Sequence, residues 1–281
     1  MSAAVAIVTD STAYLPAEVA DRHGVTVVPL QISIGGSVSE EGVDITAAEA
    51  ARALREWHPV TTSRPSPVRF ADAYEAAARA GATGVVSVHL SAAMSGTVEA
   101  ARLAARDAPV AVEVVDTGTI GMGVGFAALS AAVAARLGAS IEDVAAAARH
   151  RAQRSRSLIY VDTLEHLRRG GRIGAAATLL GSALMVKPLL GIAGGRIEPL
   201  EKVRTPSRAL ARLADLAAEF AGDREVDLAV HHLAAQGRAD ALAARLRERI
   251  PRYGELHVGQ VGPVIGAHAG PGMVGVVVAP R

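Results

Sequence analysis

Four stretches rich in hydroxyl groups and one isolated histidine are the parts of this sequence best suited to do chemistry. The hydroxyl-rich stretches are TDSTAYLP (9–16), VTTSRPSP (60–67), HLSAAMSGT (89–97) and DTGTIGMGVG (116–125). Hydroxyls beside the free N–H groups of helix starts suit an anion that is held by hydrogen bonds rather than by a full opposite charge. His268 lies in VGPVIGAHAGPG (261–272), where the glycines indicate a loop that turns sharply or approaches another group closely.

The hydroxyl groups also have a simpler interpretation. Serine and threonine are favoured at helix N-caps, so each of them can serve its own helix and bind no ligand. Four such stretches on one edge of a sheet favour an anion site over four separate caps. The sequence leaves both interpretations open.

Other kinds of site find little support. The chain has no cysteine, which excludes disulfides, zinc–thiolate sites and cysteine nucleophiles. GMGVG (121–125) lacks the G-x-G-x-x-G spacing of a dinucleotide-binding loop, and MSGT (94–97) lacks the second glycine of a hydrolase nucleophile elbow. His231 and His232 are adjacent, so in a strand they point to opposite faces. We therefore predict no metal and no nucleotide cofactor, and a serine hydrolase has little support.

HLRRGGRIG (166–174) places three arginines and His166 around a double glycine. Arginine near a helix C-terminus complements the helix dipole, and glycine commonly ends a helix, so a solvated helix end explains these residues. The alternative is a surface that docks an acidic partner or a phosphate. Both interpretations remain open from the sequence.

The first half of the chain alternates short apolar runs with helical patterns. The predicted strands are VAIVTD (5–10), VTVVPLQISI (25–34), GVVSVHL (84–90) and VAVEVVD (110–116). A capping-box spacing from Thr46 to Glu49 predicts one helix, and Ser66 followed by Pro67 predicts the start of another. This alternation predicts a parallel, doubly wound sheet, with all four hydroxyl-rich stretches at the carboxyl edge of its strands.

The pattern changes after about residue 155. Gly194 and Gly195 separate two strand-like runs and predict a hairpin. The later predicted elements are helices over 206–221 and 235–250 and strands within EVDLAVHHL (225–233), ELHVGQV (255–261) and MVGVVVAP (273–280). We predict an α/β protein of two domains: residues 1–155 with the parallel sheet, and residues 156–281 with a mixed or antiparallel sheet.

The amino-acid composition limits the classes of protein to which this chain can belong. Half of the 281 residues are hydrophobic but only 3% are aromatic, so the core consists of Ala, Val, Leu and Ile and can leave an elongated void. The net charge of +1 gives no argument for binding nucleic acid. The N-terminal residues read as a strand rather than a signal peptide, and the uncharged stretch 117–135 as a loop and a buried helix. We expect a soluble, cytoplasmic protein.

Several segments together resemble one family. In chain order they are VTDSTAYLP, EEGVDIT, TTSRPSP, MSGTVEAA, VVDTGTIGMGVG, HLRRGGRIG, KPLL, KVRT and VGPVIGAHAGPG. Several are weak signals alone, but their ordered combination is similar to the DegV-type fatty-acid-binding proteins. In bacteria these present an acyl chain to a separate fatty acid kinase.

The resemblance implies a two-domain α/β carrier, not an enzyme, that buries a long-chain fatty acid in an apolar tunnel and presents its carboxylate to the kinase for acyl phosphate formation. The residues implied to bind the carboxylate are Thr62, Ser63, Ser95, Gly96 and His268. Arg172 is implied to contact the kinase. We expect the fatty acid as the only bound group, no nucleic-acid partner, and a monomer that can make transient contact with a membrane.

Four positions depart from the family pattern. Arg64 replaces a usual glutamine, Thr117 a frequent serine, Val98 a common aromatic residue and Ala269 a common threonine. These departures leave Thr62, Ser95 and His268 intact but leave the preferred acyl chain open.

A second hypothesis belongs to another class. The same hydroxyl-rich edge suits an enzyme that acts on a small anionic metabolite, with His268 as its acid or base. Asp10 and Asp116 are expected to order loops instead.

Overall fold

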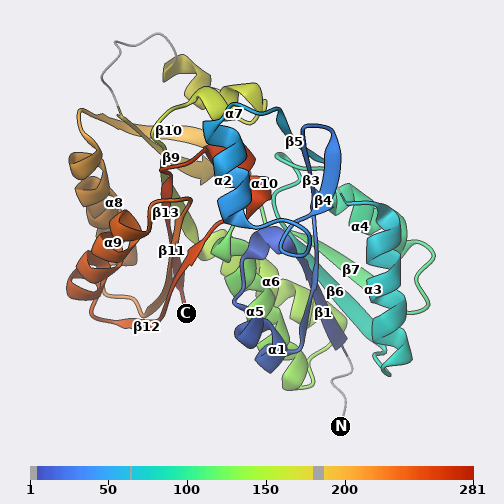
Figure 1. Cartoon of the computed structure of the whole chain (residues 1–281). Coiled ribbons are helices and arrows are strands. Elements are labelled where there is room, and N and C mark those ends of the chain that lie inside the picture. The colour runs from blue at the N-terminus through green and yellow to red at the C-terminus, as the bar shows by residue number, and fades with distance from the viewer. Residues whose placement is uncertain (1–4, 64, 180–186) are drawn as a thin grey trace. The chain divides into compact units, whose positions relative to one another are not determined.

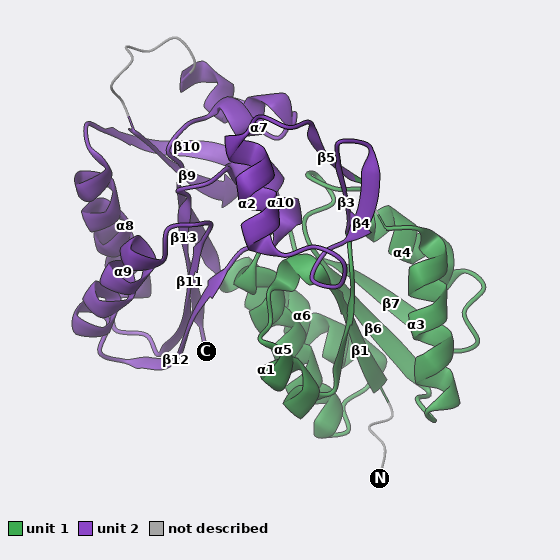
Figure 2. Cartoon of the chain, in the orientation of Figure 1, with its two compact units in different colours: residues 1–30, 63–154 green, residues 31–62, 155–281 purple. Residues whose placement is uncertain are grey.

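The computed structural model describes residues 5–63, 65–179 and 187–281. The chain divides into two compact units, which Figure 2 colours separately. Unit 1 comprises Met1–Leu30 and Ser63–Arg154, and unit 2 comprises Gln31–Thr62 and Ser155–Arg281. The division predicted between residues 155 and 156 lies one residue from the observed one, between Arg154 and Ser155, but 31–62 group with the second unit rather than the first.

Unit 1 is built on a four-stranded parallel sheet in the order β2-β1-β6-β7. Its strands are β1 (Val5–Asp10), β2 (Val25–Val28), β6 (Gly84–His89) and β7 (Ala111–Asp116). Helices α1 (Ala17–His23), α5 (Met122–Arg136) and α6 (Ile141–Arg154) cover one face, and α3 (Pro67–Arg79) and α4 (Thr97–Ala105) cover the other (Figure 1). The parallel, doubly wound sheet is therefore confirmed.

Local signals in unit 1 produce the elements they predict. The Ser66 hydroxyl accepts the N–H of Val68 at 3.4 Å, and Pro67 is the first residue of α3. The uncharged stretch 117–135 forms a loop and then α5, most of whose residues are buried. No helix in the described ranges is both long and apolar enough to cross a bilayer.

Residues 31–63 form a small three-stranded sheet in the order β4-β3-β5, with a helix between β4 and β5 in the chain. The elements are β3 (Gln31–Ile34), β4 (Ser37–Glu40), α2 (Ala47–Arg55) and β5 (Val60–Ser63). The strand region predicted over 25–34 divides into two strands, β2 and β3, which belong to different sheets. Pro29 separates them and has no N–H for a sheet ladder. Thr46 and Glu49 form the predicted capping box of α2.

Unit 2 contains a six-stranded mixed sheet in the order β10-β9-β8-β13-β11-β12. Its strands are β8 (Arg156–Tyr160), β9 (Lys187–Ala193), β10 (Arg196–Val203), β11 (Val226–His232), β12 (Tyr253–Gln260) and β13 (Val274–Pro280). Only β11 and β12 pair in parallel among these neighbours; the others are antiparallel. Gly194 and Gly195 form the predicted hairpin turn with φ of 55° and 75°. The mixed second sheet is confirmed.

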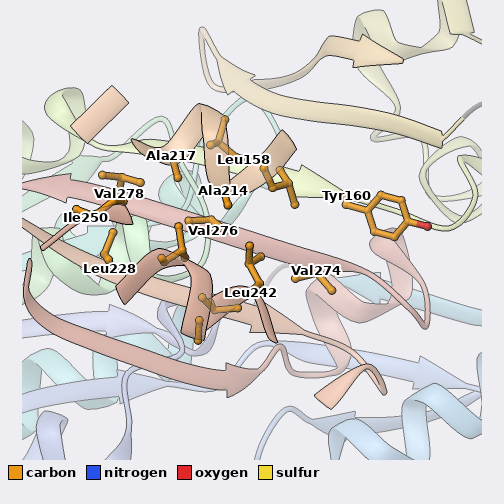
Figure 3. Close-up of a cluster of buried hydrophobic side chains, with 14 of the residues drawn as sticks. Leu158, Tyr160, Ala214, Ala217, Leu228, Leu242, Ile250, Val274, Val276 and Val278 are labelled. Atoms are coloured by element: carbon orange, nitrogen blue, oxygen red, sulfur yellow. The ribbon is translucent and has the colours of Figure 1, made fainter. Parts of the chain in front are cut away.

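The core of unit 2 lies between this sheet and helices α8 (Pro206–Ala221) and α9 (Gln236–Arg249). Figure 3 shows part of it, with Leu228, Val276 and Val278 of the sheet facing Ala217 and Leu242 of the helices. Aliphatic side chains fill most of the cluster, as the low aromatic content predicts. Their burial, at about 25 cal/mol per Å² of apolar surface, is the main stabilising contribution to this unit.

Candidate functional site

His268 lies in a short helix rather than in the loop that the glycines suggested. Helix α10 (Pro263–Ala269) begins with Pro263, whose fixed φ suits a first helical position, and ends at Gly270 with φ of 78°. The prediction of a loop was therefore wrong. The same glycine and proline residues mark the two ends of a single short helix.

The structure brings His268 together with Thr62, which lies 206 residues earlier in the chain. The Thr62 Oγ1 atom is 2.8 Å from Nε2 of the imidazole. Thr62 reaches the ring from β5, and both residues belong to unit 2. Two of the residues implied to bind a carboxylate are thus direct neighbours.

The environment of His268 keeps its ring uncharged at neutral pH. Burial, and secondarily the positive charge of Arg172, lower the pKa of His268 to about 4. The Nδ1 atom is buried and has no hydrogen-bond partner among the described residues. A neutral imidazole and a hydroxyl together can offer hydrogen bonds to an anion without adding a charge.

Gly170 lies close to the Nδ1 side of the His268 ring. It follows α7 (Glu165–Arg169), and a methyl group at this position would overlap Nδ1 of His268. Any larger residue than glycine would therefore have to displace the imidazole.

The arginine cluster around Gly170 ends a helix, as the simpler interpretation proposed. Gly171 has φ of 68°, and the Arg172 N–H donates to the Leu167 carbonyl at 3.0 Å. The exposed Arg172 side chain donates from Nη1 to the Gly170 carbonyl at 2.8 Å. The helix-end interpretation is confirmed, and the proposed partner contact of Arg172 stays a prediction.

Ser95 and Gly96 belong to unit 1 and precede α4. Gly96 is the N-cap residue of α4 and makes no side-chain cap. The Ser95 hydroxyl lies 2.8 Å from Oγ1 of Thr97. Ser63, the exposed last residue of β5, is also assigned to unit 1. The N-cap interpretation therefore does not account for Ser95.

The four hydroxyl-rich stretches do not share one sheet edge. Three of them follow β1, β6 and β7, at the carboxyl edge of the parallel sheet. The stretch 60–67 instead contains β5 of the small sheet, so its predicted place at that edge was wrong. Arg64 lies outside the described residues.

Asp10 and Asp116 order the loops at that edge, as predicted. The Asp116 carboxylate accepts the N–H groups of Ala92 at 3.1 Å and Gly118 at 2.9 Å. Asp10 accepts the N–H of Leu90 at 3.1 Å. The loop that carries Ser95 is thus fixed by two carboxylates.

Asp10 also ends a buried polar chain that the sequence did not point to. Its Oδ2 atom is 3.0 Å from Nδ1 of His89, and Nε2 of His89 is 2.7 Å from the Ser87 hydroxyl. The Tyr74 hydroxyl donates to Ser87 at 2.9 Å. All four side chains are fully buried. The available signal was one serine and one histidine two residues apart in the otherwise apolar strand β6.

Within the described ranges, no three His, Cys, Asp or Glu side chains are grouped so as to hold a metal ion.

Two of the residues that depart from the family pattern have ordinary structural roles. Val98 is buried in α4, and the Thr117 hydroxyl donates to the His89 carbonyl at 2.8 Å.

Comparison with known proteins gives consistent matches over the chain. A family model described as the DegV family matches residues 4–281. A DegV domain-containing protein of Streptomyces coelicolor is 59% identical over 281 residues, which is 100% of both chains. A solved DegV family protein of Thermus thermophilus, described for its fatty acid binding, is 34% identical with a TM-score of 0.93 over 99% of each chain. DegV of Bacillus subtilis, a fatty acid binding protein, is 31% identical with a TM-score of 0.90, also over 99% of each chain.

Proposed function

The chain belongs to the DegV family, and from this premise we propose that it binds a long-chain fatty acid and presents the carboxylate to a partner fatty acid kinase. The kinase would transfer a phosphoryl group to the carboxylate and form an acyl phosphate. The contact between Thr62 and His268 carries the proposal, because it pairs two of the side chains that the family resemblance assigns to the carboxylate.

The proposal assigns the carboxylate to five residues. They are Thr62, Ser63, Ser95, Gly96 and His268. A carboxylate removed from water must accept hydrogen bonds in several directions, or it becomes protonated. Hydroxyl groups, a neutral imidazole and backbone N–H groups meet this need. They add no charge that would hold the carboxylate back from an incoming phosphoryl group.

Affinity is expected to come chiefly from the acyl chain. Burying about 14 methylene groups contributes about 11 kcal/mol of transfer free energy, from which the loss of chain and translational freedom subtracts several kcal/mol. The result is binding between roughly nanomolar and micromolar concentrations. The polar residues then decide which end of the ligand is presented.

The first test is direct. Protein purified without organic solvent is expected to show, by native mass spectrometry, an added mass that matches a long-chain fatty acid. Delipidated protein should then bind oleate in a titration and fail to bind octane-1,8-diol, which lacks the carboxylate and the long tail. Protein that carries no acyl mass and takes up no fatty acid would contradict the proposal.

A substitution at Arg172 tests whether lipid binding and kinase coupling depend on different residues. We expect Arg172→Ala to keep oleate affinity within about threefold, because the side chain is exposed, and to lower kinase-coupled acyl phosphate formation at least tenfold. Arg196→Ala, which removes an exposed arginine from β10, is the control and should change neither quantity. Loss of oleate binding with normal coupling would reverse the assignment of Arg172.

The alternative, an enzyme for a small anionic metabolite, receives less support. A general acid or base works best when its pKa lies near the working pH, whereas burial lowers the pKa of His268 to about 4. We propose further that the protein acts as a monomer in the cytoplasm and meets membranes only transiently, when the fatty acid is exchanged.

A further inference from the structure

Glu41 is a buried carboxylate bonded to the helix that carries His268. It follows β4, and only 5% of its surface is exposed. Its Oε1 atom accepts the backbone N–H of Val264 at 2.7 Å, although the two residues are 223 positions apart. A buried carboxylate is costly unless its oxygens accept hydrogen bonds. The hydrogen bond from Val264 therefore offsets part of the cost of burying Glu41.

The sequence around the start of α10 suits a cap supplied from elsewhere. Pro263 has no N–H, so Val264 offers the first free donor of the helix. The N-cap residue, Gly262, has no side chain to accept it, and a methyl group there would overlap the carboxylate of Glu41. Glu41 therefore stands where an N-cap side chain would normally lie, and its negative charge matches the helix dipole.

The same segment of chain holds both ends of α10. Glu41 binds the N-terminal end and Thr62 binds His268 in the last turn, and both residues lie within 31–62. Helix α10 also packs against α2, β3 and α7. A helix of seven residues is not stable alone, so its position depends on these contacts.

We propose that Glu41 is a positioning residue for His268: by fixing the start of α10, it sets the place of the imidazole against Thr62. The proposal rests on the proposed function only in taking His268 as a ligand of the fatty acid carboxylate. Glu41 itself is not proposed to touch the ligand. Its effect passes through α10, which behaves as a short rigid connection between the two contacts.

The first measurement needs no ligand. In 15N-histidine NMR titrations, with the signal assigned by its loss in His268→Gln, the His268 ring should stay neutral down to about pH 4 in the wild type. Glu41→Ala should release the end of α10, expose the ring to water and raise its pKa by at least one unit. Glu41→Gln keeps an oxygen that accepts the Val264 N–H and should stay within half a unit. Glu18→Ala, which removes an exposed carboxylate from the first turn of α1, should change nothing.

The second measurement is a double-mutant cycle on oleate affinity. Glu41→Ala should weaken binding about tenfold in the wild type but less than twofold when His268 is already alanine, because its effect passes through that residue. Equal losses in the two backgrounds, or an unchanged His268 pKa in Glu41→Ala, would overturn the proposal. If the wild type binds no oleate, the proposed function fails and the NMR titration still decides the role of Glu41.

A second variant reaches the same contact from the other side. Gly262→Ala places a methyl group against the Glu41 carboxylate, and the backbone there, with φ of −73°, accepts alanine. It should raise the His268 pKa as Glu41→Ala does, and it replaces that variant if Glu41→Ala does not fold. A wild-type titration curve for His268 in Gly262→Ala would contradict the proposed connection.

Discussion

His268→Ala is expected to bind oleate about 10- to 100-fold more weakly than the wild type. A hydrogen bond to a charged group contributes about 1.5–3 kcal/mol, and in the proposed complex the imidazole donates one to the carboxylate. Binding of methyl oleate should change less than threefold, because the ester has no charge and its acyl chain keeps its burial. Calorimetric titration of both ligands measures the difference.

The variant must also remain folded for this comparison. We expect urea unfolding of His268→Ala to resemble that of the wild type, since the described residues give the ring one side-chain hydrogen bond, to Thr62. His150→Ala removes an exposed imidazole from α6 and is the matched control. Equal weakening of oleate and methyl oleate would show that His268 supports the acyl chain or the fold and not the carboxylate.

Asp10→Ala is expected to lower the free energy of unfolding by about 3–5 kcal/mol, because each buried donor left without an acceptor costs about 1–3 kcal/mol. The carboxylate accepts the N–H groups of Thr12 at 3.0 Å and Leu90 at 3.1 Å and lies 3.0 Å from Nδ1 of His89. Alanine leaves these buried donors without an acceptor. Urea denaturation followed by circular dichroism measures the loss.

Two further variants test the cause. Asp21→Ala removes an exposed carboxylate from α1 and should change the free energy of unfolding by less than about 0.5 kcal/mol. Asp10→Asn keeps an oxygen acceptor and should fall between alanine and the wild type. A loss below about 1 kcal/mol for Asp10→Ala would mean that water or neighbouring groups satisfy the donors.

Features encoded by neighbouring residues were predictable from the sequence. The start of α3 at Ser66 and Pro67, the capping box of α2 and the hairpin at Gly194 and Gly195 all depend on residues within one turn of each other. The alternation of strands and helices likewise gave the parallel sheet of unit 1. Such signals act over a few residues, so they are present in the chain before it folds.

Pairings over long distances were not predictable in this way. Apolar periodicity marks a strand but not its partner, so β2 and β3 read as one element although they join different sheets. The grouping of 31–62 with unit 2 follows from such pairings. For the same reason one of the four hydroxyl-rich stretches was placed on the wrong edge.

The same distinction between local signals and long-range contacts applies to the candidate site. The order of amino acids was enough to single out Thr62 and His268 by chemical type and by resemblance to a family. It could not show that Thr62 meets the imidazole, that Glu41 caps α10 or that Asp10 meets His89, because their partners lie 206, 223 and 79 residues away. Burial, and with it the lowered pKa of His268, exists only once the folded chain has excluded water from the ring.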